Sequence, residues 1–118
     1  KLAVRTGARV VTYGFEEKCD VRAVETKLTD KGLFTRLLTP AGEIEVASGL
    51  VGTFNVYNVM AAAAAGVSFG FDPALMVAGI YSVKGVPGRL ERIPNRKSMT
   101  ILVDYAHSPD ALMNSRCS

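Results

Sequence analysis

The sequence predicts an α/β fold, in which an antiparallel β meander is followed by two helices and then by the start of a second α/β unit. Three observations support this prediction. Residues 20–47 alternate polar and apolar side chains between turn signals, residues 53–68 form an alanine-rich run of helical length, and residues 98–105 are apolar on both faces of an expected strand.

The first residues predict the end of a helix and a strand. Residues 1–6 have the character of a last helical turn that Gly7 closes, and residues 9–14 form a β-branched run bounded by glycine. This order predicts the final strand of a mainly parallel sheet. Because the chain opens on a helix end and stops inside another expected helix, we expect both of its ends to be cut from a longer protein.

Residues 20–47 predict three antiparallel strands. Turns are expected at 30–32 and 40–42, where glycine allows a positive φ, with strands at 33–39 and 43–47. The clean alternation in the last of these predicts one exposed face. We therefore interpret the meander as a structural sheet.

The helix expected at 53–68 carries the first candidate binding residues. Thr53 is predicted to cap its N-terminus, and the small side chains of 60–65 predict close packing by a neighbouring element. Asn55 and Asn58 are three residues apart and should project on one side of the helix. Two interpretations stay open: the amides present donors and acceptors to a heterocycle, or they bond the neighbouring backbone.

A second helix and a hinge follow. Asp72 as N-cap and Pro73 in the first turn predict a helix that ends near Ser82. The Gly/Pro segment 85–88 then breaks the chain and is typical of a domain hinge, and 94–97 is expected to be an exposed turn.

The strand expected at 98–105 would be central in a parallel sheet, and it leads into a polar loop. Asp104 and His107 lie at the end of this strand, and Ser108 is expected to cap a further helix. A stiff strand that releases an acid and a histidine into a loop is a common way to direct polar groups at a ligand. The alternative is a structural turn with a salt bridge at the sheet edge.

Composition excludes several classes of function. The net charge is +3, from 14 basic and 11 acidic residues, and the basic residues are scattered, so nucleic acid is not an expected partner. Residues 50–71 are too polar for a membrane span. Two distant cysteines and one histidine form neither a metal cluster nor a disulfide framework, so we expect a reducing, cytoplasmic setting.

Three blocks of sequence, at 52–58, 85–91 and 103–110, resemble the Mur ligases of bacterial cell-wall synthesis in their order and spacing. The resemblance is greatest to the member that adds the third amino acid, diaminopimelate or lysine, to a UDP-MurNAc-dipeptide. It implies that residues 1–86 are the C-terminal part of a central ATP-binding domain. Residues 87–118 would then be the hinge and the start of a Rossmann-like C-terminal domain.

The resemblance also implies roles for five residues. Asn55 and Asn58 resemble the family's amides at the adenine, with Asn58 the better candidate for contact with the base. Arg89 resembles the arginine that reaches the nucleotide across the closed interface, and Asp104 the carboxylate that accepts hydrogen bonds from the ribose hydroxyls. His107 would only position the adjoining loop. In this family ATP, with Mg²⁺, converts a carboxylate to an acyl phosphate that an amine then attacks.

Essential parts of that chemistry are missing from the sequence. It contains no Gly-x-x-x-x-Gly-Lys-Ser/Thr phosphate loop, and we assign no catalytic residue and no metal ligand to it. We therefore predict that the chain alone has no ligase activity, and that apolar faces left without partners would favour self-association. The alternatives are a piece of a cyanophycin synthetase or folylpolyglutamate synthetase, or a non-catalytic binding module.

Overall fold

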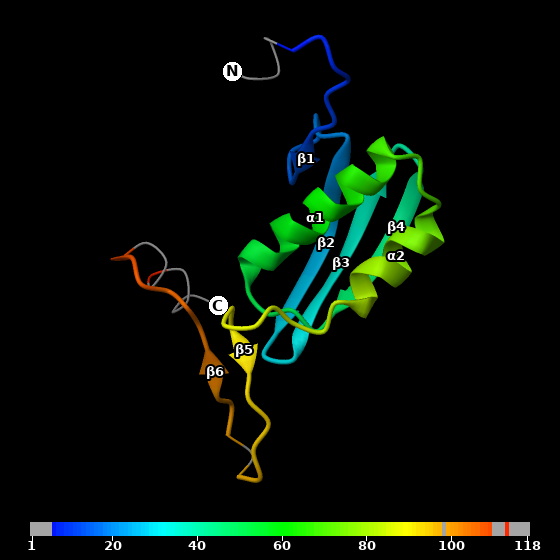
Figure 1. The fold of residues 1–118 in the computed structure, drawn as a ribbon. Coiled ribbons are helices and arrows are strands. Elements are labelled where there is room, and N and C mark those ends of the chain that lie inside the picture. Colours follow the sequence, from blue (N-terminus) through cyan, green and yellow to red (C-terminus); the bar gives the residue numbers. More distant parts are fainter. Residues whose placement is uncertain (1–5, 98, 110–112, 114–118) are drawn as a thin grey trace.

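The computed structural model describes residues 6–97, 99–109 and 113 and confirms the mixed α/β architecture. Helices α1 and α2 lie across one face of a four-stranded sheet, and a short hairpin extends beyond one end of it (Figure 1). The sheet, in the order β1-β2-β3-β4, consists of β1 (Tyr13–Gly14), β2 (Val21–Thr29), β3 (Gly32–Thr39) and β4 (Gly42–Ser48). The other elements are α1 (Thr53–Ser68), α2 (Pro73–Ser82), β5 (Glu91–Arg92) and β6 (Leu102–Val103).

The predicted antiparallel meander is confirmed, and its two turns have the same construction. The hydroxyl of Thr29 donates to the carbonyl of Gly32 over 3.0 Å, and that of Thr39 donates to the carbonyl of Gly42 over 2.7 Å. Each hydroxyl also accepts the backbone N–H two residues further on. Both glycines have positive φ, so each turn uses a conformation that other residues rarely adopt.

A β-bulge in β2 changes which residues face the core. The register with β3 shifts between Ala23 and Glu25, so Val24 has no residue opposite it. Before the bulge Ala23 is buried, and after it Thr26 faces inward, with its Oγ1 3.2 Å from the Oγ1 of the buried Thr35. The bulge explains why the hydrophobic alternation of this strand is imperfect in the sequence.

The core lies between the inner face of the sheet and α1. Its fully buried side chains are Val21, Leu37 and Val46 from the sheet and Val56, Met60 and Ala63 from α1. The predicted close packing of residues 60–65 is confirmed on the core side, where Met60, Ala63 and Ala64 are buried. The next residue, Gly66, packs against α2. A Cβ on Gly66 would lie 2.5 Å from Met76 Sδ, so the two helices can approach this closely only because position 66 has no side chain.

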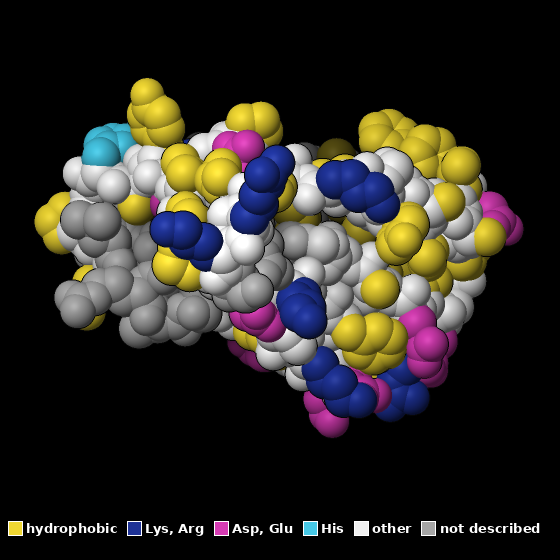
Figure 2. All heavy atoms as spheres, turned by 90° about the horizontal axis from the view of Figure 1, so that it is seen from below, with side chains coloured by type: hydrophobic (Ala, Val, Ile, Leu, Met, Phe, Trp, Pro, Cys, Tyr) yellow, Lys and Arg dark blue, Asp and Glu magenta, His cyan; other side chains and the backbone are white. Residues whose placement is uncertain are grey.

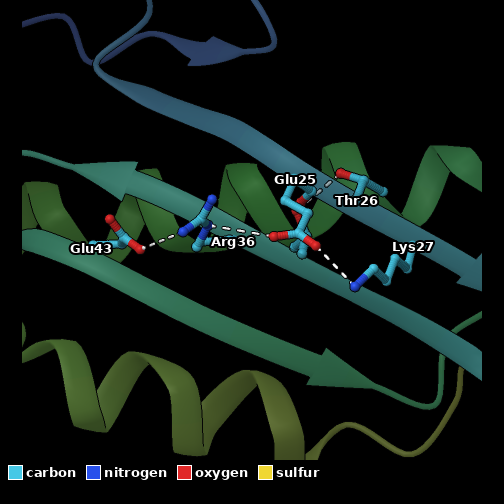
Figure 3. A network of polar contacts seen from close by, with 6 residues as sticks. Glu25, Thr26, Lys27, Arg36 and Glu43 are labelled. Atoms are coloured by element: carbon cyan, nitrogen blue, oxygen red, sulfur yellow. Dashed lines mark hydrogen bonds and ion pairs between the residues drawn. The ribbon is translucent and has the colours of Figure 1, made fainter.

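Charged side chains form a network on the outer face of the sheet (Figure 3). Arg36 Nη1 lies 3.4 Å from Glu43 Oε1, and its Nε lies 3.7 Å from Glu25 Oε2, which is an ion pair too long for a hydrogen bond. Lys27 Nζ is 2.9 Å from the other Glu25 oxygen. Lys27 and, less strongly, Arg36 lower the pKa of Glu25, so this carboxylate stays charged.

The strand predicted at 9–14 is mostly wrong. Only Tyr13–Gly14 is a strand, and it pairs in parallel with β2 of the meander, so no mainly parallel sheet is formed by the described residues. Just before β1, side-chain hydrogen bonds hold the chain in place of strand pairing, because Asp20 Oδ2 accepts both the N–H and the hydroxyl of Thr12. The helix end predicted at 1–6 lies, except for Thr6, outside the described residues.

The strand predicted at 98–105 is also much shorter than expected. It is limited to Leu102–Val103, which is exposed and pairs antiparallel with β5, so the prediction of a central parallel strand is wrong for the described residues. An apolar run is buried on both faces only where other layers cover it, and the described residues supply none here. The helix expected after Ser108 falls largely on residues 110–112 and 114–118, outside the described part.

Helix α2 begins as predicted, since Asp72 Oδ1 accepts the N–H of Ala74 over 2.8 Å. Within the described ranges, no helix has the length and apolar character needed to cross a membrane.

The link between Thr12 and Asp20 gives a pH-dependent prediction. The Thr12 hydroxyl, followed by its N–H, lowers the pKa of Asp20, so the link stabilises the fold above the ordinary carboxyl pKa and is lost as the pH falls through the lowered value. We expect Thr12→Val to raise the pKa of Asp20 in a carboxyl-carbon NMR titration and Thr12→Ser to leave it low. Equal pKa values in both variants would contradict the assignment.

Candidate functional site

The first turn of α1 is built on a glycine, not on the predicted threonine cap. Gly52 is the N-cap with φ of 94°, and no side chain caps the helix. Thr53 is already the first helical residue, so its hydroxyl is one position too late to reach the free N–H groups. The prediction of Thr53 as N-cap is therefore wrong.

Asn55 and Asn58 lie together, as their spacing predicts. Asn55 is only 5% exposed, and its Nδ2 donates to the carbonyl of Val51 over 2.6 Å. Its Oδ1 accepts from Asn58 Nδ2 over 3.1 Å. The backbone-bonding interpretation is thus confirmed for Asn55. Because a carbonyl can only accept, this chain of bonds also assigns the orientation of both amides.

The two asparagines line an apolar hollow of about 380 Å³ between α1 and α2. Its other walls include Leu50, Val59, Ile80 and Val83. Asn58 is exposed, so its remaining acceptor and donor are accessible there. An apolar hollow with a few fixed polar groups is typical of a site for a small molecule.

A second hollow of about 300 Å³ adjoins the first, since Leu50 and Val86 line both. Its charged lining comes from separate segments, the β2–β3 turn and the chain on both sides of the Gly/Pro segment: Asp30, Lys31, Lys84, Arg89 and Glu91. The structure therefore brings Arg89 close to the asparagine hollow. Lys84 Nζ is held 3.9 Å from the centre of the Tyr81 ring.

Asp104 and His107 do not line either hollow. Asp104 Oδ1 accepts the N–H of Ala106 over 3.0 Å, and His107 Nδ1 lies 2.9 Å from the carbonyl oxygen of Tyr105. The N–H of Tyr105 donates to the carbonyl of Gly88 over 2.7 Å. That bond joins the segment containing Asp104 and His107 to the turn that carries Arg89.

Sequence reasoning missed two residues beside Arg89. Leu90 is 6% exposed and has φ of 44°, and Glu91 accepts a backbone N–H of the turn. Both lie in the block 85–91, whose glycines and arginine are the residues on which the sequence predictions rest. A non-glycine residue with positive φ has no signal in one sequence.

On the face seen in Figure 2, Lys and Arg side chains are scattered among acidic, hydrophobic and other groups. Among the described residues, no group of three or more His, Cys, Asp or Glu side chains is placed to hold a metal ion.

Comparison with known proteins identifies the same family that the sequence motifs resemble. Residues 1–66 match the Mur ligase middle domain. Over 110 residues, 93% of this chain, the sequence is 47% identical to the UDP-N-acetylmuramoyl-L-alanyl-D-glutamate–2,6-diaminopimelate ligase of Geobacillus kaustophilus, and it spans 22% of that protein.

Solved structures of similar fold include MurF of Acinetobacter baumannii, with a TM-score of 0.79 and 28% identity. The alignment covers 89% of this chain and 23% of that one. The folylpolyglutamate synthase of Mycobacterium tuberculosis, in complex with ADP and AMPPCP, has a TM-score of 0.76 and 26% identity over 98% of this chain and 25% of that one. The middle-domain match covers more than half of this chain, and the alignment with the diaminopimelate ligase covers nearly all of it. The chain belongs to the Mur ligase family.

Proposed function

We propose that the chain forms the adenosine-side part of an ATP-dependent ligase of the MurE type. The observation that carries the proposal is the apolar hollow lined by Asn55 and Asn58 next to the hollow lined by Arg89. The whole enzyme would add the third amino acid to a UDP-MurNAc-dipeptide. The name of the 47% identical relative favours 2,6-diaminopimelate over lysine as that amino acid.

The orientation of Asn58 suits adenine. After Nδ2 has donated one hydrogen to Asn55, the side chain keeps an acceptor oxygen and a second N–H. Adenine presents the complementary pair, an amino donor beside a ring-nitrogen acceptor, and on the edge that carries N7 guanine instead presents two acceptors. We therefore propose adenine, the base that the family resemblance implies, between the apolar walls of the hollow.

The remaining candidate residues complete the nucleotide site in the proposal. The guanidinium of Arg89 would neutralise phosphate charge, and Asp104 would accept hydrogen bonds from the ribose hydroxyls. His107 would only position its loop. With the domain boundary proposed between residues 86 and 87, the asparagines and Arg89 belong to different domains, so bound nucleotide would favour the closed arrangement.

The proposed reaction makes a poor electrophile reactive. A peptide carboxylate takes the γ-phosphoryl group of ATP to become an acyl phosphate, the amine of the incoming amino acid attacks its carbonyl carbon, and phosphate leaves. The phosphate loop and the Mg²⁺ ligands are expected outside this chain, so no step is assigned to a metal here. The chain alone should show no turnover, and the cytoplasm is the proposed location.

The nearest alternative is a ligase that extends folate, since the folylpolyglutamate synthase has the same fold. Its identity of 26%, against 47% for the diaminopimelate ligase, favours the cell-wall substrate. Turnover of a full-length ligase containing this segment with UDP-MurNAc-dipeptide, and not with a folate, distinguishes the two.

The test of the nucleotide site is Asn58→Ala in such a full-length ligase. We expect the KM for ATP to rise about tenfold, because one bidentate base contact is lost. Thr53→Ala is the matched control at the N-terminus of the same helix, where the hydroxyl caps nothing, and should leave the KM unchanged. An unchanged KM in Asn58→Ala would contradict the proposed adenine site.

A further inference from the structure

The turn that carries Arg89 is fastened on both sides of the arginine. The N–H of Arg89 donates to the carbonyl of Val86 over 3.0 Å, and the two residues form an isolated β-bridge. Between them, Gly88 has φ of 70°. A tight turn of this kind presents the arginine side chain at its end.

Glu91 closes this turn from the other side. Its Oε2 accepts the N–H of Gly88 over 2.9 Å, and the carbonyl of Gly88 accepts the N–H of Tyr105 over 2.7 Å. Both polar groups of the Gly88 backbone are therefore bonded, one of them to a charged acceptor. Hydrogen bonds to charged groups are among the stronger ones in proteins.

The buried side chain of Leu90 also holds the turn in place. It is 6% exposed and lines the hollow that Leu28, Val51 and Leu102 also line. Its φ of 44° is the one positive value among the non-glycine residues described. Such a conformation costs free energy and persists only where the surroundings hold it, here by burial on one side and the Glu91 bond on the other.

The carboxylate of Glu91 is used for the backbone and not for the neighbouring arginine. Within the described part of the chain, Arg89 takes part in no ion pair, although Glu91 lines the same hollow. A carboxylate beside a site for phosphate opposes the ligand by its charge, so its presence there needs another reason, which its bond to the Gly88 N–H supplies.

We propose that Glu91 is a positioning residue for Arg89, acting through the Gly88 N–H to hold the guanidinium toward the nucleotide. This inference rests on the proposed function of Arg89. It requires an acceptor oxygen at position 91 but no negative charge. Glutamine, which keeps that oxygen, should therefore substitute for glutamate, and alanine should not.

The test compares Glu91→Ala, Glu91→Gln, Arg89→Ala and the double variant Glu91→Ala with Arg89→Ala in the full-length ligase. We expect Glu91→Ala to raise the KM for ATP about tenfold with kcat little changed, because a misplaced guanidinium loses its hydrogen bonds. Glu91→Gln should recover most of this loss. The double variant should have the KM of Arg89→Ala, since a positioning residue has no effect without the group that it positions.

Each outcome separates the two proposals. Suppose that Arg89→Ala raises the KM for ATP and that the double variant has a still higher KM. The positioning role of Glu91 is then wrong, and the nucleotide role of Arg89 stands. The same conclusion follows if Glu91→Gln raises the KM as much as Glu91→Ala does. If Arg89→Ala leaves the KM unchanged, the role of Arg89 fails, and the role of Glu91 fails with it.

Discussion

Gly32→Ala is expected to lower the free energy of unfolding of the 118-residue chain by about 4 kcal/mol, from backbone strain plus a steric clash. The glycine has φ of 149°, and a Cβ there would overlap the carbonyl oxygen of Ser48 and lie 3.2 Å from Gly49 Cα. Backbone atoms of the neighbouring strand cannot move aside as a flexible side chain can. Urea unfolding followed by circular dichroism measures the loss.

The chain contains its own control for this prediction. Gly42 holds the equivalent place in the second turn of the meander, with φ of 121°, but nothing lies within 4 Å of a Cβ built on it. Gly42→Ala should therefore cost only the backbone strain, about 2 kcal/mol. Equal losses for the two variants would mean that the close approach of Gly32 to β4 does not limit stability.

Gly66→Ala should lower the free energy of unfolding by about 2 kcal/mol, which is typical of an extra methyl group in a packed core. The new Cβ would lie 2.5 Å from Sδ and 2.7 Å from Cγ of Met76, a buried residue of α2. The methionine can turn away only by giving up its own packing. The same unfolding experiment tests this.

Gly79→Ala is the matched control, because Gly79 is also helical but has nothing within 4 Å of its Cβ position. This variant should raise the free energy of unfolding by roughly 0.5–1 kcal/mol, since alanine favours a helix more than glycine does. A stabilising effect of the same size in Gly66→Ala would contradict the close contact between α1 and α2.

Local signals were sufficient to predict the meander and the two helices. Turn residues at 30–32 and 40–42 fix the ends of the strands, and Asp72 with Pro73 marks the start of α2. The bulge at Val24 could not be predicted. An extra residue in one strand becomes visible only when the partner strand is known.

The two strands that were predicted too long share one cause. Residues 9–14 and 98–105 have strand composition, but a strand extends only as far as a partner pairs with it. In the described structure each has a partner for two residues, Tyr13–Gly14 on β2 and Leu102–Val103 on β5. Composition alone carries no information about that partner.

The candidate site was predictable in part. Helical spacing was enough to place Asn55 beside Asn58, but the direction of their hydrogen bonds depends on the carbonyl of Val51, whose position comes from the loop before α1. Glu91 gave no signal, because its partner is a backbone N–H and any residue at position 88 except proline would carry one. The roles of all five candidates, including Asp104 and His107, stay predictions.

The charged outer face of the sheet bears on how copies of the chain would meet. A second sheet stacking there would have to strip water from Glu25, Arg36 and Glu43 at once, and that cost opposes face-to-face aggregation. A different surface, beyond the C-terminal end of α1, favours association instead. Phe69 and Phe71 are exposed there, and their ring centres are 5.8 Å apart. Association of the isolated chain at high concentration should therefore depend on these aromatic rings and little on added salt.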